Sequence, residues 1–181
     1  MPAFFLKGRS VIFKLPIREA FYELFRLFRP FIRPKVGIEF KQSERTNIVL
    51  PGLLHVNIFG YYYAIVVKNI PSRLLFRNRS IPNPILSVKY GNIQSEVEWR
   101  RDNVQQLHSG SSLESGPFMF YDVEQGTIFL YNFQDEIVCT ITNENDILVI
   151  ELINSEGRPY VKKFKIEHDR QNRIVSFVPT R

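Results

Sequence analysis

The sequence predicts an all-β fold, an antiparallel β-sandwich preceded by a short basic amphipathic helix. Beyond residue 35, about ten short segments alternate apolar and polar residues at the period of two, with turn residues between them. No spacing typical of βαβ units appears. The chain of 181 residues is about one domain long, and its 44% hydrophobic and 23% charged residues exclude a mostly disordered protein.

The positive charge is confined to the first 35 residues. Eight basic residues against Glu19 and Glu23 account there for the whole net charge of +6, so the rest of the chain is neutral. This asymmetry divides the chain into a basic arm, residues 1–35, and a predicted sandwich domain, residues 36–181.

Residues 17–29 of the arm predict a helix, because Pro16 precedes the segment and Pro30 ends it. Winding the segment at about 100° per residue separates a hydrophobic face from a polar face. At ~1.5 Å per residue such a helix is too short to cross a membrane of ~30 Å. The predicted docking residues are Phe21, Leu24, Phe25 and Phe28 on the hydrophobic face and Arg18, Arg26, Arg29 and Arg33 among the basic residues.

Three interpretations of the arm stay open. The helix packs on the body of its own chain or on a partner protein, it lies on an anionic membrane surface, or it binds nucleic acid as a basic arm. The many phenylalanines weigh against the nucleic-acid interpretation. A signal peptide is not expected, because Lys7, Arg9 and Lys14 interrupt each apolar run.

Residues 46–67 contain no formally charged residue and are long enough to imitate a membrane span. Pro51-Gly52 and Gly60 interrupt the run, however, and apolar residues alternate with His55 and Asn57. Two strands separated by a turn are therefore predicted, the second of them, residues 61–67, buried on both sides.

The remaining strands of the body follow from the same alternation. Residues 36–40 and 93–100 read as half-buried antiparallel strands. Further strands are predicted at 85–90, 118–122, 127–133, 136–142, 147–153, 160–167 and 173–178. The segment 108–117, rich in serine and glycine, is predicted to be an exposed loop.

Three segments resemble the immunoglobulin-like sandwiches of microbial surface and membrane-tethered proteins. They are Tyr62 to Asn69, Val97-Glu98-Trp99, and the lysine-alternating Tyr160 to Ile166. In those domains a strand ending in V-x-N enters a loop, a later strand carries a tryptophan, and the last strand alternates lysine with apolar residues. The resemblance implies a binding or scaffolding role.

No motif for catalysis, metal binding or nucleotide binding is present. His55, His108 and His168 are far apart, and Cys139 is the single cysteine. The serine-rich loop after His108 is not expected to hold a catalytic nucleophile, because no G-x-S-x-G turn positions one. Arginines near Phe76 and Trp99 are interpreted as a solvated, ion-paired surface.

The sequence thus predicts a non-enzymatic interaction or scaffold module without cofactor or metal. Its expected partner is a protein or an anionic membrane surface, and its expected location is the cytoplasm, peripheral to the membrane where the arm binds lipid. The alternative is an accessory subunit that binds nucleic acid through the arm. The oligomeric state does not follow from the sequence.

Overall fold

Strands form the body of the chain in the computed structural model, which describes residues 34–45, 59–71, 79–101, 104–131, 137–141, 146–154, 159–169, 171 and 174–180. The chain divides into two units, Met1–Arg33 and Pro34–Arg181, so the second unit begins two residues before the predicted boundary. The predicted helix and all eight of its docking residues lie outside the described residues. The strand expected around 54–58 lies outside them as well.

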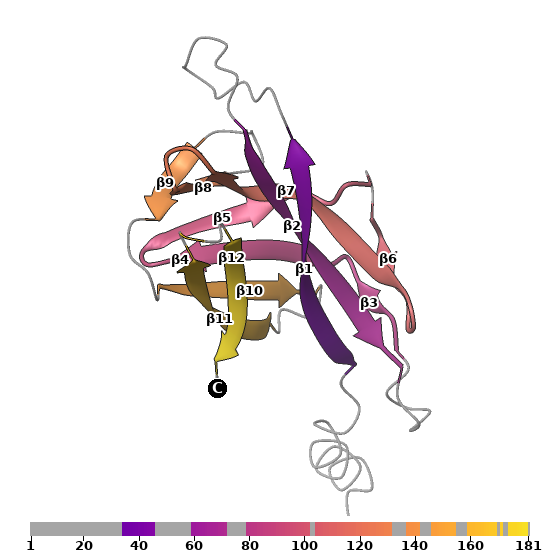
Figure 1. Ribbon diagram of the computed structural model, residues 1–181. Helices are drawn as coiled ribbons and strands as arrows, with labels where there is room; N and C mark the ends of the chain where they lie inside the picture. The colour runs from indigo at the N-terminus through magenta and orange to yellow at the C-terminus, as the bar shows by residue number, and fades with distance from the viewer. Residues whose placement is uncertain are drawn as a thin grey trace, which may run out of the picture. The chain divides into compact units, whose positions relative to one another are not determined.

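The described residues contain twelve strands and no helix (Figure 1). The strands are β1 (Lys35–Arg45), β2 (Gly60–Ile70), β3 (Ile81–Pro82), β4 (Ile85–Tyr90), β5 (Ile93–Val97), β6 (Gln106–Leu107), β7 (Ser112–Asp122), β8 (Thr127–Tyr131), β9 (Ile137–Ile141), β10 (Ile147–Ile153), β11 (Pro159–Asp169) and β12 (Ile174–Thr180). The prediction of an all-β body is confirmed.

Two five-stranded sheets and one small sheet contain these strands. The first sheet has the order β1-β2-β7-β8-β9, the second sheet has the order β12-β11-β10-β4-β5, and β3 pairs with β6. All paired strands are antiparallel, as predicted. Each large sheet joins an antiparallel pair of consecutive strands to a three-stranded meander, in line with the tendency of consecutive strands to lie side by side.

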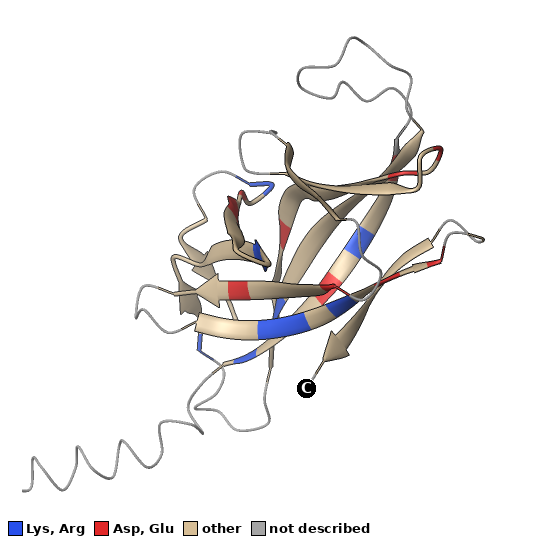
Figure 2. Cartoon of the chain, turned by 90° about the vertical axis from the view of Figure 1, so that its left-hand side faces the viewer, with Lys and Arg blue, Asp and Glu red and all other residues tan. Residues whose placement is uncertain are grey.

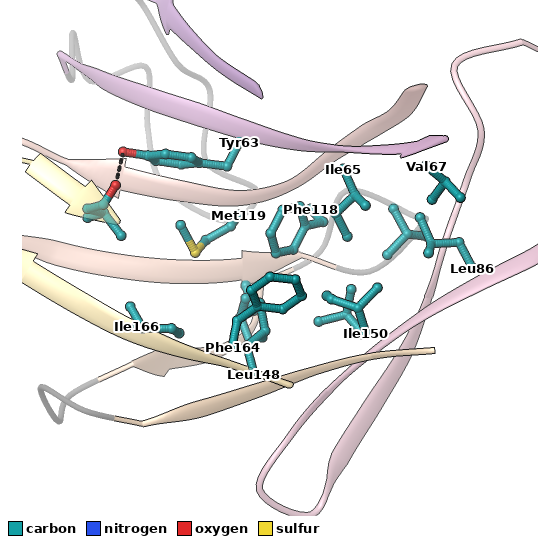
Figure 3. Packing of buried hydrophobic residues seen from close by; sticks show 14 of the residues in the cluster. Tyr63, Ile65, Val67, Leu86, Phe118, Met119, Leu148, Ile150, Phe164 and Ile166 are labelled. Atoms are coloured by element: carbon teal, nitrogen blue, oxygen red, sulfur yellow. Dashed lines mark hydrogen bonds between the residues drawn. The ribbon is translucent and has the colours of Figure 1, made fainter. Parts of the chain in front are cut away.

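The core lies between the inward faces of the two large sheets (Figure 3). Alternate residues of β2 and of β10 point into it, because successive side chains of a strand point to opposite faces. The buried set from these two strands is Tyr63, Ile65, Val67, Leu148, Ile150 and Leu152. A sandwich-like architecture with one hydrophobic core follows. β2 is buried on its inner face and half-buried on its outer face, so the expectation of burial on both sides was wrong.

Aromatic side chains close the sandwich where β1 and β12, one edge strand of each large sheet, face each other. The Phe40 ring stacks on Phe177 at a centroid distance of 3.8 Å and an angle of 15°. It also meets the edge of Phe164 at 4.8 Å and lies 6.0 Å from Phe118. One ring from the first sheet thereby contacts strands of both sheets.

A bulge in β7 links the two sheets on the opposite side. The pairing of β2 with β7 shifts register around Ala64, and there Gly116 N–H donates to the Glu98 carbonyl at 2.8 Å. Arg100 N–H donates to the Glu114 carbonyl at 2.9 Å, and Trp99 forms a bridge with Ser115. The segment predicted as an exposed loop is thus strand from Ser112 onward, because pairing with β2 and with the residues after β5 outweighs its loop-like composition.

Replacing Ser115 with alanine tests this link. The Ser115 hydroxyl accepts the buried Ile65 N–H at 2.9 Å, at the point where the bulge removes a backbone acceptor. The substitution leaves that N–H unpaired and is expected to lower the free energy of unfolding by about 1–3 kcal/mol in urea titrations. Ser176→Ala is the control, since Ser176 is exposed and its hydroxyl makes only a 3.5 Å contact. Equal stability of the two variants would contradict the role of Ser115.

Candidate interaction surface

The exposed large aliphatic residues of the described chain share one face of the second sheet. Its members are Ile85 (47% exposed), Ile147 (41%), Val161 (46%), Ile174 (52%) and Val178 (40%). Leu86, Leu148 and Val175 are buried in the core, so their immediate neighbours Ile85, Ile147 and Ile174 point outward. All five residues therefore lie on the outer face of the second sheet, spread over β4, β10, β11 and β12.

Charged side chains accompany these aliphatic residues. Along β11 the outward positions are Val161, Lys163, Lys165, Glu167 and Asp169, so two basic residues precede two acidic residues in one row. Figure 2 shows basic and acidic segments along the strands of the body. Lys165 donates to Glu167 at 3.0 Å within this row. We call the outer face of β11 and β12, with Ile147 beside it, the β11–β12 face.

Neighbours across the strands complete the β11–β12 face. Lys165 lies opposite Val178 of β12 and opposite Ile147 of β10. Asp169 lies opposite Ile174 and accepts the Gln171 N–H at 3.0 Å in the turn that follows β11. Each charged position of the row thus has an apolar or hydroxyl-bearing neighbour on β12, and Lys165 has an apolar neighbour on both sides.

The edges of the two sheets carry features that oppose pairing with a further strand. β1 bears four charged residues between Lys35 and Glu44, and β12 contains Pro179, which has no N–H to donate. The pairing of β9 shifts register beside Tyr131, and the chain after β5 turns to β7. Contacts with other molecules are therefore expected through the faces of the sheets.

The outer face of the first sheet is more enclosed. Tyr62, Phe120 and Phe129 stand opposite one another on β2, β7 and β8, with ring centroids 5.0 and 6.4 Å apart. Phe120 is fully buried although its neighbours in sequence point to the core on the other side. These rings form a second small hydrophobic cluster, which offers little free surface.

An ion-paired group joins β1, β7 and the residues after β5. The Glu114 carboxylate accepts hydrogen bonds from Lys41 at 2.8 Å and from Arg100 at 2.7 Å. These partners, Lys41 first, hold the pKa of Glu114 below its ordinary value. The pairing of Arg100 agrees with the expectation of an ion-paired surface around Trp99, whose indole N–H donates to the Pro84 carbonyl at 2.7 Å.

The two histidines that the structure describes are both hydrogen-bonded to hydroxyl groups. His168 of β11 contacts the buried Tyr121 hydroxyl of β7 through Nε2 at 2.8 Å, a link between the two sheets. The exposed His108 contacts the Ser80 hydroxyl at 3.3 Å. Within the described ranges, no group of three or more His, Cys, Asp or Glu residues could hold a metal ion.

Cys139 and Asn69 are placed by packing. Cys139 of β9 is half-buried, and burial raises the pKa of its thiol, which keeps the thiol protonated near neutral pH. The buried Asn69 amide donates to the carbonyls of Arg79 and Leu107 at 2.7 and 3.2 Å. The asparagine of the V-x-N segment therefore attaches the end of β2 to the residues around β3 and β6.

Tyr63 makes the stability of the protein sensitive to alkaline pH. Burial raises the pKa of Tyr63 to about 12 from 10.0, while its hydroxyl contacts the Val175 carbonyl at 3.5 Å. The unfolded chain therefore loses this proton first, so the stabilisation is complete below pH 10 and is lost as the pH rises toward 12.

The effect of Tyr63 is measurable by substitution. The free energy of unfolding is expected to fall by about 1 kcal/mol between pH 9 and 11 through this residue, and Tyr63→Phe removes that part of the slope. Urea titrations at pH 8 to 11 measure it. Tyr160→Phe, at a half-buried position, is the comparison. Parallel slopes in the wild type and in Tyr63→Phe would contradict the assignment.

The fold and its surfaces define an all-β, sandwich-like protein with exposed aliphatic residues on one outer face. No family model matches the chain, and no curated protein or solved structure matches it. Among the described residues, no helix is long and apolar enough to span a membrane.

Sequence reasoning placed the candidate site in the arm and missed the β11–β12 face. The available signal was the order of charges in Lys163, Lys165, Glu167 and Asp169, each separated by one residue. The alternation shows that these residues share one face of a strand. That Ile147 and Val178 flank them depends on strand order, which the alternation does not contain.

Proposed function

We propose that the chain is a non-enzymatic interaction module that docks to a partner protein or to an anionic membrane surface through the basic amphipathic segment of residues 17–29. The observation that carries the proposal is the sequence pattern of this segment, in which Phe21, Leu24, Phe25 and Phe28 fall on one side of a helical winding and arginines on the other.

The distribution of charge also supports a docking role. The arm carries the whole net charge of +6, and the body is neutral. A hydrophobic face with arginines around it combines apolar burial with attraction to anionic lipid or to an acidic protein surface. A cytoplasmic protein, peripheral to the membrane where the arm binds lipid, is the corresponding location.

The proposed kinship with immunoglobulin-like sandwiches depends on the two-layer antiparallel architecture. Immunoglobulin constant domains have sheets of four and three strands, whereas both large sheets here have five, each with a hairpin and a meander. The kinship therefore extends to architecture, and it favours binding or scaffolding over catalysis.

Co-sedimentation with vesicles tests the docking role. The full chain is compared with a variant in which Phe21, Leu24, Phe25 and Phe28 are serine, on anionic and on neutral vesicles at low and moderate salt. Binding to anionic vesicles that the serine variant loses is the expected result for a membrane-docking arm. A matched variant with Arg18, Arg26, Arg29 and Arg33 replaced by lysine keeps the charge and is expected to bind.

The other outcomes separate the remaining interpretations. Absence of vesicle binding overturns the membrane form of the proposal. In that case, aggregation of the serine variant would indicate that the segment belongs to the core of its own chain. Retention on heparin and binding of single-stranded DNA with a steep salt dependence, both lost when the four arginines become glutamine, would instead favour the nucleic-acid alternative.

A further inference from the structure

We propose that two copies of the chain form a symmetric dimer by packing their β11–β12 faces against each other. The inference is independent of the docking role of the arm. It commits to a second copy as the occupant of this face, and it follows from the order of the charges along β11 and the exposed aliphatic residues beside them.

The charges along β11 are complementary to themselves. Lys163, Lys165, Glu167 and Asp169 occupy successive outward positions, so the row has a basic half and an acidic half of equal length. A two-fold axis that crosses the row beside Ile166 sets two rows antiparallel. Lys165 then faces Glu167 of the second copy, and Lys163 faces Asp169 of the second copy. In a two-fold interface one patch must complement itself in this way.

The apolar groups around the row provide surface to bury. Val178 and Ile147 flank Lys165 on its two sides, and Ile174 stands beside Asp169. These three residues are between 40% and 52% exposed. Facing sheets pack about 10 Å apart, a distance that lysine and glutamate side chains from both copies reach across. The interface would thus combine aliphatic contacts with charged pairs in its middle.

The charge pattern also argues against other occupants of this face. Glu167 and Asp169 would repel an anionic membrane or a nucleic acid, because both are exposed at one end of the row. Pairing through the edge of β12 is opposed by Pro179, which offers no N–H there. Within one copy Lys165 contacts Glu167 at 3.0 Å. In the dimer, this pair and the same pair of the second copy would form a group of four charges around the axis.

Charge reversal on the full chain tests the proposal. The acidic variant carries Lys163→Glu and Lys165→Glu, and the basic variant carries Glu167→Lys and Asp169→Lys. Each row then has a single sign, so each variant alone is expected to self-associate at least about tenfold more weakly than the wild type. An equimolar mixture is expected to form a heterodimer, because all four facing pairs become attractive. Sedimentation velocity over a range of concentrations measures both.

Two controls complete the design. Lys35→Glu with Lys68→Glu makes the same change of charge on β1 and β2 of the first sheet and is expected to leave association unchanged. The variant with all four β11 charges reversed restores complementarity and is expected to dimerise. Circular dichroism and urea titrations establish that each variant is folded.

The results that overturn the proposal are specific. A wild type that stays monomeric at the highest concentrations reached excludes the dimer. Association of either single-sign variant as strong as that of the wild type, or a mixture that stays monomeric, assigns association to another surface, such as the arm.

Discussion

Phe118→Ala is expected to lower the free energy of unfolding by about 3–5 kcal/mol, because the ring is among the most deeply buried of the core. Phe118 is 1% exposed and lies 6.0 Å from Phe40 and 6.4 Å from Phe177 by ring centroids. These rings come from β7, β1 and β12, so the truncation opens a cavity where both sheets contribute side chains (Figure 3).

Urea titrations of the wild type, Phe118→Ala and Phe118→Leu measure this effect. Leucine keeps part of the volume and is expected to cost less than alanine, since the penalty grows with the cavity that remains. Typical domains have a total stability of about 5–15 kcal/mol, so this loss in the alanine variant is a large fraction of the total. A loss below 1 kcal/mol would mean that the ring is not a shared element of the core.

Gly60→Ala is expected to destabilise the protein by about 3 kcal/mol or more through overpacking. A Cβ at this position would overlap both the Phe120 ring and the carbonyl oxygen of Tyr121. The ring could rotate, but the carbonyl belongs to the backbone of β7, so β2 and β7 would have to separate. The β1–β2 hairpin and the small aromatic cluster would both be disturbed.

Gly116→Ala is the matched control for Gly60. A Cβ at position 116 would lie 3.7 Å from the Glu98 carbonyl oxygen, which is an ordinary contact distance. The loss of stability in Gly116→Ala is therefore expected to be small. Thermal unfolding of the two variants compares them. A Gly60→Ala protein as stable as Gly116→Ala would show that β7 does not approach Gly60 so closely. Combining Gly60→Ala with Phe120→Leu distinguishes the two overlaps. The leucine relieves the overlap with the ring and leaves the overlap with the Tyr121 carbonyl oxygen.

Most strands could be predicted from the sequence because each has a strong local signal. Residues 85–90 and 147–153 were predicted with the bounds that β4 and β10 have, and both alternate a buried set with an outward set. Ser112 to Pro117 was predicted as a loop and is strand, because serine and glycine have weak strand preferences. There the partners, β2 and the residues after β5, decide the structure, and a single sequence does not reveal partners.

The two candidate surfaces also differ in how far the sequence could predict them. The arm was predicted as a docking element from its own composition, and it stays a prediction, since residues 1–33 lie outside the described part of the chain. The β11–β12 face depends on which strands are neighbours. Ile147 and Val178 are distant in sequence, yet both lie opposite Lys165.

The sequence by itself determined the all-β class, the antiparallel pairing and the separation of a basic arm from a neutral body. These properties follow from composition and from a period of two, both of which are local. The tertiary structure alone decided which strands lie side by side, where β7 links the two sheets, and which aliphatic residues stay exposed. The reason is physical: strand order depends on the combined burial of residues that are far apart in the chain, and no short segment of the sequence contains that information.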